Sequence, residues 1–384
     1  MKRRIVVLFG GRSAEHEISV VSARSVLDAL DAERYEPVAI GVTKDGRWHL
    51  VDGGPRALAQ AASPGALPAV AEGAGPEVAL DQEPGSQALV AADGDRTEID
   101  VVFPVMHGPY GEDGSIQGFL EIVGVPYVGA GVLGSAIGMD KAVQKVLFRA
   151  AGIPVVDHEV VQEREWEEDA EAVEARAEHL AYPLFSKPAT LGSSVGVVKV
   201  GDAEGLRPAL EEAFRYGSKA VLERAVEDAL EVEVAVLGND DPVASIAGQI
   251  VPRGHPFYDY EAKYLDERGA ELLIPAPLEE GTHAEVRRLA VAAFCASECS
   301  GMARVDFFVR PTGEILLNEI NTIPGFTQIS MYPKLWEASG LPFADLVDRL
   351  VELAIERHAR ERKKGTGARR VIEPPASTGG RPGR

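Results

Sequence analysis

The chain has 384 residues, of which 45% are hydrophobic and 26% charged, a composition typical of a globular protein with two or three domains. Its formal net charge of −21 argues against nucleic acid or an anionic membrane as the main partner, although local lysines can still bind an anion. The sequence has no long apolar run and no signal peptide, and it has only two cysteines, so we expect a cytoplasmic protein.

The first residues predict a parallel sheet with a glycine turn. An apolar run at residues 5–9 ends in the Gly-Gly-Arg-Ser turn 10–13, and an amphipathic segment follows with Ser13 as its expected N-cap. A second apolar run at 37–42 completes a strand–turn–helix–strand unit. We therefore expect an N-terminal Rossmann-like domain at residues 1–129.

Residues 53–97 are rich in Ala, Gly and Pro, and we expect them to form a surface insertion in this domain. A buried strand returns at 99–105, and the polar turn 107–114 follows it. Ligands of open parallel sheets bind beyond the carboxyl ends of the strands, where this turn and the first glycine turn both lie. His107 is there either a ligand for a carboxylate or a structural histidine of the turn.

The segment 129–134, Gly-Ala-Gly-Val-Leu-Gly, matches the dinucleotide fingerprint letter for letter. That fingerprint belongs in the first turn of a Rossmann unit, and here it opens no new unit. An NAD-dependent oxidoreductase is therefore the alternative from another enzyme class, and it rests on this segment alone.

Residues 130–224 predict a central α+β unit. We expect, in chain order, a helix at 139–151, a strand at 155–161, an acidic helix at 163–180 and strands at 183–187 and 195–200.

A possible phosphate site lies between the last two of these strands. Lys187 closes the first of them, and the Gly-Ser-Ser-Val-Gly loop 192–196 follows. Such a loop offers backbone N–H groups and hydroxyls to phosphates, and the lysine adds a positive charge. The Walker pattern is absent, and an ordinary hairpin is the alternative. Lys141 is a second candidate for a phosphate contact.

The most informative segment is a predicted hairpin with strands at 304–309 and 314–321. If the loop has two residues, Asp306 faces Glu319 and Arg304 faces Asn321, all on one side of the sheet. Two carboxylates and an amide suit Mg²⁺ with phosphate oxygens, and the arginine handles negative charge. A three-residue loop would shift this register by one. A polar edge ribbon facing solvent is the alternative.

The hairpin belongs to a C-terminal α+β unit that we expect at residues 225–361. A donor-rich loop at 322–331 follows the second strand and suits an anionic substrate. The aromatic and charged segment 256–264 predicts a lid. Cys295 and Cys299 are expected to be buried structural thiols. Residues 362–384 predict a disordered basic tail.

These segments together resemble the D-alanine–D-alanine ligase family of the ATP-grasp superfamily over residues 4–355. The motifs that carry the likeness are, in order, 10–19, 107–114, 139–141, 187–188 with 192–196, 257–264, 304–306 and 318–325. The implied fold is α/β (α+β overall): an ATP-grasp fold with an N-terminal Rossmann-like domain, a small central lid domain and a larger C-terminal domain.

The resemblance also implies roles for individual residues. The metal ligands would be Asp306, Glu319 and Asn321. The catalytic residues would be Glu15, Ser193, Tyr264, Arg304 and Gly325, and the substrate-binding residues His107, Lys263, Ser330 and Met331. The residues that bind ATP would be Lys141, Lys187, Ser194, Glu223, Val226, Glu231 and Phe308.

The implied reaction joins two D-alanines through an acyl phosphate, with ATP as co-substrate and two Mg²⁺ ions, which Mn²⁺ could replace, for peptidoglycan precursor synthesis. Expected partners are these small molecules and a second copy in a homodimer, with no nucleic acid or membrane. A relative that takes D-lactate or D-serine second remains open, and a non-catalytic binding protein would require a missing catalytic group.

Overall fold

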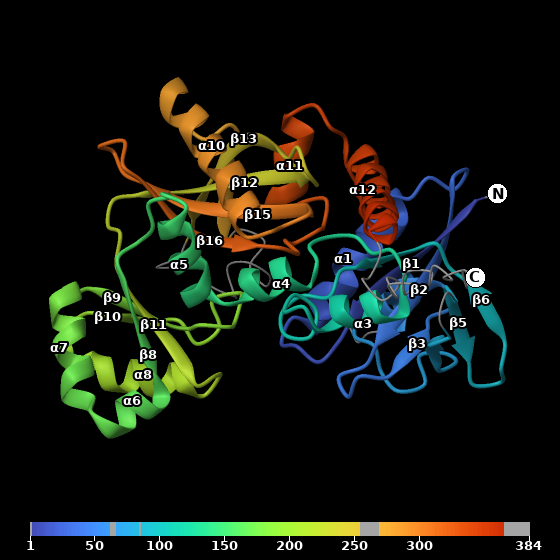
Figure 1. Cartoon of the computed structure of the whole chain (residues 1–384), viewed down its shortest axis with the longest axis horizontal. Helices are drawn as coiled ribbons and strands as arrows, with labels where there is room; N and C mark the ends of the chain where they lie inside the picture. The colour runs from blue at the N-terminus through green and yellow to red at the C-terminus, as the bar shows by residue number, and fades with distance from the viewer. Residues whose placement is uncertain (1, 62–66, 84–85, 254–268, 365–384) are drawn as a thin grey trace, which may run out of the picture.

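The structure is a computed structural model that describes residues 2–61, 67–83, 86–253 and 269–364. Its strands form an N-terminal sheet with a small satellite sheet, a central sheet and a C-terminal sheet (Figure 1). Within the described residues, no helix has both the length and the apolar character that crossing a membrane requires. The mixed α/β architecture agrees with the fold class expected from the sequence.

The N-terminal sheet is built around strand β1, which runs parallel to both of its neighbours. The β1 residues Ile5 to Phe9 are completely buried, as expected for a strand covered on both faces. The strand order β3-β2-β1-β7 confirms the predicted parallel unit, to which β3 adds an antiparallel edge. Its elements are β1 (Arg3–Gly10), α1 (His16–Ala29), β2 (Tyr35–Val42), β3 (Trp48–Leu50), α2 (Gly54–Ala61), β7 (Val101–Pro104) and α3 (Ser115–Val123).

The start of α1 differs from the prediction. Glu15, not Ser13, occupies the N-cap position, so the expected Ser13 cap was wrong. The Ser13 hydroxyl instead accepts a hydrogen bond from the Glu15 N–H at 3.2 Å. This turn places the Glu15 carboxylate just beyond the carboxyl end of β1.

The segment predicted as a surface insertion contains a sheet of its own. Three short antiparallel strands lie side by side in the order β4-β5-β6. They are β4 (Val78–Leu80), β5 (Ala88–Ala91) and β6 (Arg96–Glu98).

The central sheet has the order β10-β9-β11-β8, and the helices that connect β8 to β9 and β10 to β11 lie on one side of it (Figure 1). Its elements are α4 (Val132–Met139), α5 (Lys141–Ala150), β8 (His158–Gln162), α6 (Glu163–Glu168), α7 (Ala170–Leu180), β9 (Leu184–Pro188), β10 (Val198–Val200), the 3-10 turn η1 (Ala203–Gly205), α8 (Leu206–Phe214) and β11 (Lys219–Arg224). The single acidic helix predicted at 163–180 was wrong. Asp169 breaks it in two because its side chain caps the new helix by accepting from Ala172 N.

The C-terminal sheet has the order β14-β13-β12-β15-β16. Its elements are β12 (Leu230–Gly238), β13 (Val243–Pro252), β14 (Ala270–Leu273), α10 (Glu280–Ala296), β15 (Gly301–Val309), β16 (Ile315–Asn321), α11 (Met331–Ala338) and α12 (Phe343–Lys363). Helix α12 lies beside α1, and its predicted apolar stripe belongs to one hydrophobic core with β1 (Figure 1). Cys299 is buried as expected, but Cys295 is exposed, so that prediction was wrong for Cys295; both thiols are free.

The β15–β16 hairpin reaches its predicted register by an unexpected route. The loop has three residues, because Arg310 N donates to Glu314 O at 2.9 Å and Gly313 takes a left-handed φ of 85°. The two-residue loop expected from the sequence was therefore wrong. A β-bulge at Asn318 then shifts the register by one, so Asp306 does face Glu319 and Arg304 does face Asn321.

The glycines of the fingerprint-like segment have a packing role. Gly129 lies against Gly301, where an added Cβ on Gly301 would stand 3.1 Å from the Gly129 Cα. A Cβ on Gly134, inside α4, would stand 2.7 Å from the Glu298 carbonyl oxygen. Close contact with the C-terminal unit therefore accounts for glycine at position 134, and a left-handed φ of 99° accounts for glycine at position 129, without a dinucleotide.

We expect Gly134→Ala to lower the free energy of unfolding by about 1–3 kcal/mol, because the new methyl group overpacks against backbone. Urea denaturation measures this change. Gly281, also in a helix but with open space around it, is the matched control. Gly281→Ala should be neutral or stabilise the protein by up to about 1 kcal/mol. Equal stability of the two variants would contradict the packing explanation.

Candidate active site

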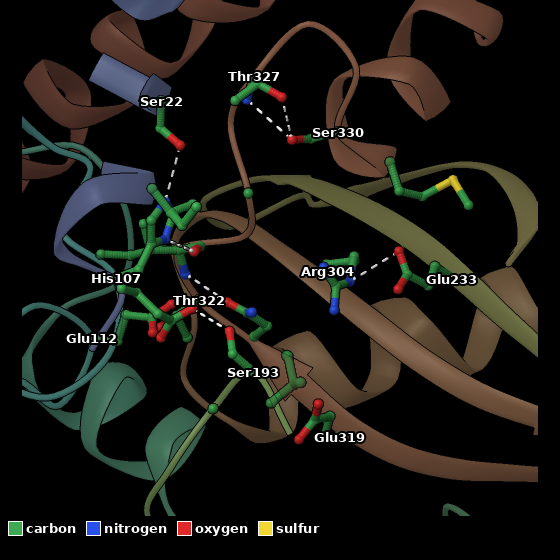
Figure 2. A pocket seen from close by; sticks show the side chains of 18 of the residues that line it. Ser22, His107, Glu112, Ser193, Glu233, Arg304, Glu319, Thr322, Thr327 and Ser330 are labelled. Carbon is green, nitrogen blue, oxygen red and sulfur yellow. Dashed lines mark hydrogen bonds and ion pairs between the residues drawn. The ribbon is translucent and has the colours of Figure 1, made fainter. Parts of the chain in front are cut away.

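A cavity of about 570 Å³ lies where the three units meet. Its walls come from the turns after β1 and β7, the glycine loop after β9, the polar face of the β15–β16 hairpin and the loop before α11 (Figure 2). The structure brings together in this cavity the predicted residues Glu15, His107, Lys141, Ser193, Arg304, Glu319, Asn321, Gly325, Ser330 and Met331.

The glycine loop is fastened to the N-terminal unit. The Ser193 hydroxyl donates a short hydrogen bond to the Glu15 carboxylate, which is only 7% exposed. Ser193 and Ser194 both take left-handed φ values, of 50° and 59°, and so turn the loop sharply over the cavity. Glu15 thus presents a nearly buried negative charge, the chemistry that holds an ammonium group.

The hairpin face alternates acidic and basic groups. Arg304 Nε and Nη2 donate to the two oxygens of Asp306 at 2.8 and 2.7 Å. Lys141 Nζ lies 3.0 Å from Glu319 Oε2 and donates to Leu191 O of the glycine loop at 2.8 Å. Burial alone would lower the pKa of Lys141, but Glu319 outweighs burial and raises it. Lys141 is therefore charged at neutral pH.

Arg304 carries a second carboxylate partner. Glu233 of β12 is 5% exposed, and its Oε2 lies 3.1 Å from Arg304 Nε (Figure 2). Burial opposes the arginine's charge, but Asp306 and Glu233 outweigh it and raise its pKa well above the usual range. Arg304 Nη1 makes no hydrogen bond to the described residues, so that nitrogen can serve a ligand.

A second charged cluster stands behind the glycine loop. Lys145 Nζ and Lys187 Nζ lie 2.9 and 2.6 Å from the two oxygens of Glu223. Both lysines also donate to the bulge residue Asn318, to its carbonyl at 3.1 Å and to its side chain at 3.4 Å. Burial would raise the pKa of Glu223, but the two lysines outweigh burial and lower it to about 2.

His107 is held by protein groups on both sides of its ring. Nδ1 lies 3.1 Å from the Ile323 carbonyl, which only accepts, so Nδ1 carries the proton. Nε2, 3.1 Å from Ser22 Oγ, then accepts from that hydroxyl (Figure 2). Burial lowers the pKa of His107, so the ring is neutral at neutral pH. This geometry favours the structural alternative over direct binding of a carboxylate.

Glu112 lies in the same wall of the cavity. It accepts a hydrogen bond from Gly108 N at 2.7 Å and is 9% exposed. Burial, together with the nearby charge of Glu15, raises the pKa of Glu112 well above its usual range. Glu112 therefore holds its proton more readily than an exposed glutamate does.

Hydrogen-bond donors gather where the loop after β16 meets α11. Gly325 N makes no hydrogen bond within the described residues. Met331 opens α11, where the first N–H groups have no acceptor within the helix. Ser330 Oγ accepts from Thr327 N at 3.1 Å and lies 2.8 Å from Thr327 Oγ1 (Figure 2). A helix start with a hydroxyl beside it suits a carboxylate.

Several predicted residues lie outside this cavity. Asp306, Lys187, Ser194 and Glu223 adjoin its walls as described, whereas Val226 lines a smaller cavity of about 180 Å³. Glu231 and Phe308 face each other across β12 and β15. Lys263 and Tyr264, and with them the predicted lid, lie outside the described residues.

The donor set suits a hard divalent cation. Among the described residues no cluster of three His, Cys, Asp or Glu side chains could hold a metal. Asp306, Glu319 and Asn321 instead offer two carboxylates and an amide on neighbouring strands, which leaves coordination positions for phosphate oxygens.

Comparison with known proteins agrees with this geometry. The sequence profile for the D-ala D-ala ligase N-terminus matches residues 4–130, and the profile for the D-ala D-ala ligase C-terminus matches residues 147–352. The chain belongs to the D-alanine–D-alanine ligase family. Members of this family are ATP-dependent ligases with the ATP-grasp fold.

Individual relatives of the ligase family cover nearly the whole chain. The D-alanine–D-alanine ligases of Thermoanaerobacter sp. strain X514 and Streptomyces griseus are 49% and 48% identical, over 93% of this chain and 98% and 93% of theirs. The ligase structure from Coxiella burnetii is 41% identical with a TM-score of 0.82, covering 94% of this chain and 96% of its own. The VanG D-Ala:D-Ser ligase of Enterococcus faecalis is 33% identical with a TM-score of 0.81, covering 92% and 100%.

Residue-by-residue sequence reasoning gave no role to Glu112, Lys145 or Glu233. Each left a signal. Lys145 stands four residues after Lys141 and so shares a helix face with it. Glu233 follows Glu231 by two in a strand that is otherwise almost entirely apolar. Glu112 lies in the polar turn after a buried strand.

We expect the stability of the protein to fall below about pH 6.5, partly through His107. Its pKa is lowered in the folded state, so only the unfolded chain takes up a proton as the pH drops past the unfolded value. The free energy of unfolding, measured in urea from about pH 8 to about pH 5, should decline less steeply in His107→Gln. The other histidines are common to both proteins and serve as the internal control. Identical slopes would contradict the neutral, buried His107.

Proposed function

We propose that this protein joins two D-alanines into D-alanyl-D-alanine with ATP, for peptidoglycan precursor synthesis. A carboxylate oxygen of the first D-alanine attacks the γ-phosphorus of ATP, and ADP leaves. The amine of the second then attacks the acyl phosphate, phosphate leaves and a proton is released. The observation that carries the proposal is one cavity in which an ammonium-binding carboxylate, Glu15, faces the Arg304 and Glu319 wall.

The phosphate end of ATP would lie against the hairpin. Asp306, Glu319 and Asn321 would hold two Mg²⁺ ions, or Mn²⁺ in their place, which supply charge neutralisation on the phosphate oxygens. Lys141, Lys187 and Ser194 would contact the phosphates. Glu223, Val226, Glu231 and Phe308 would surround the nucleoside. The Lys141–Glu319 and Lys187–Glu223 pairs support this placement, because cations and metal ligands already adjoin there.

The two amino acids would occupy the other walls. Glu15, fixed by Ser193, would bind the first ammonium. The start of α11, with Ser330 Oγ and Met331 N, would bind the second carboxylate together with Lys263, and Tyr264 would join the Glu15–Ser193 link. Arg304 Nη1 and Gly325 N would stabilise the tetrahedral oxyanion, and one such donor contributes about 3–4 kcal/mol. His107, as a neutral ring, would not bind the first substrate by an ion pair. It would instead hold Ser22 and the Ile323 carbonyl in place beside that substrate.

The second substrate is D-alanine in this proposal, and D-serine is the other candidate because the VanG D-Ala:D-Ser ligase has a similar structure. D-lactate is a third substrate to test. We also propose that the protein works as a homodimer in the cytoplasm, as expected from the family resemblance.

We expect release of phosphate from ATP only when D-alanine is present. Glu319→Gln should lower this rate roughly a hundredfold or more, because lost charge neutralisation on the phosphates is worth several kcal/mol. Phosphate release, and the dipeptide by mass spectrometry, are the measurements. D-serine or D-lactate added beside D-alanine reveals the second substrate.

Glu285→Gln is the matched control, because Glu285 pairs with Arg288 on the exposed surface of α10. It should leave the rate unchanged. Phosphate release without any D-amino acid, or full activity of Glu319→Gln at ordinary Mg²⁺ concentrations, would count against the proposed function.

A further inference from the structure

Glu233 lines the cavity beside Arg304 (Figure 2). It lies on β12, where the strand register places it directly opposite Asp306 of β15. On its other side it faces Gly248 of β13. Arg304 Nε donates its hydrogen bond to Asp306 at 2.8 Å and forms an ion pair, without a hydrogen bond, with Glu233 Oε2 at 3.1 Å (Figure 2).

The Asp306 carboxylate has two competing partners. Arg304 occupies both of its oxygens in this structure. A metal ion bound by Asp306 would need at least one of the same oxygens. If Arg304 loses its bidentate pair with Asp306, its side chain can reorient. Its Nη1 would then move away from the position in which it can donate a hydrogen bond to a ligand.

We propose that Glu233 is a positioning residue that keeps Arg304 in place when Asp306 turns to a divalent cation. This inference rests on the proposed metal site. Glu233 is almost fully buried, and removing one member of a buried ion pair is costly, so its carboxylate holds the guanidinium firmly. Because Arg304 has two carboxylate partners, a metal ion can bind Asp306 while Glu233 keeps the arginine oriented.

Without Glu233, Asp306 is the one carboxylate of the described residues that forms an ion pair with the guanidinium. Arg304 and the metal then compete directly for Asp306, and metal affinity falls. The effect passes through Arg304, so it should disappear when the arginine is absent. A double-mutant cycle with substitutions at Glu233 and Arg304 separates this indirect effect through Arg304 from a direct effect of the Glu233 charge on the metal.

The experiment measures the Mg²⁺ dependence of ADP binding by titration calorimetry, with no amino acid present. Glu233→Gln should raise the Mg²⁺ concentration needed for half-maximal binding by about tenfold. In the Arg304→Gln background the same substitution should change it far less. Thermal unfolding of each variant confirms that the protein is folded at the temperature used.

Glu271→Gln is the control, because Glu271 lies on the same sheet and pairs with Arg253 at the surface. It should leave the Mg²⁺ dependence unchanged. An equal shift from Glu233→Gln in both backgrounds, or no shift in either, would overturn the positioning role. Failure of the proposed function appears separately, as wild-type protein that forms no ADP from ATP when D-alanine is supplied.

Discussion

The site depends on pairing the carboxylates of the hairpin face, and of the cluster behind the glycine loop, with cations. In a chain with a net charge of −21, the acids of one cleft would otherwise repel each other. Arg304 holds Asp306 and Glu233, Lys141 holds Glu319, and two lysines hold Glu223. The pairing with two lysines keeps Glu223 ionised in an environment that disfavours charge, because it lowers the pKa of this carboxylate. We propose that the hairpin face exchanges a protein cation for a metal ion.

Backbone geometry decides which groups meet. The bulge at Asn318 restores the register of Asp306 and Glu319 after a three-residue loop, and it also presents Asn318 to Lys145 and Lys187. The same residue thus joins the β15–β16 hairpin to the central unit. The left-handed turn at Ser193 and Ser194 brings the glycine loop to Glu15 and joins the central unit to the N-terminal one. These two contacts assemble the cavity from separate units.

The sequence predicted what local patterns encode. Alternating side chains placed Arg304 and Asp306 on one face, and the buried run of β1 indicated a parallel sheet. Prediction from the sequence was less reliable where the role of a residue depends on neighbours that are distant in the chain. The roles of Glu112 and Glu233 depend on neighbours from other strands and turns. The state of His107 depends on Ser22 and Ile323, 85 and 216 positions away in the chain. The predicted hairpin register was right although the predicted loop length was wrong. The bulge that compensates for the longer loop leaves no clear signal in the sequence.

A crystal structure with bound ADP and Mg²⁺ tests the central claim most directly. The ion-pair arrangement predicts oxygens of Asp306, Glu319 and Asn321 on the metal, with the diphosphate between the hairpin and the glycine loop and Arg304 still against Glu233. A nucleotide bound elsewhere, with Asp306 still on Arg304 and Glu319 still on Lys141, would contradict it.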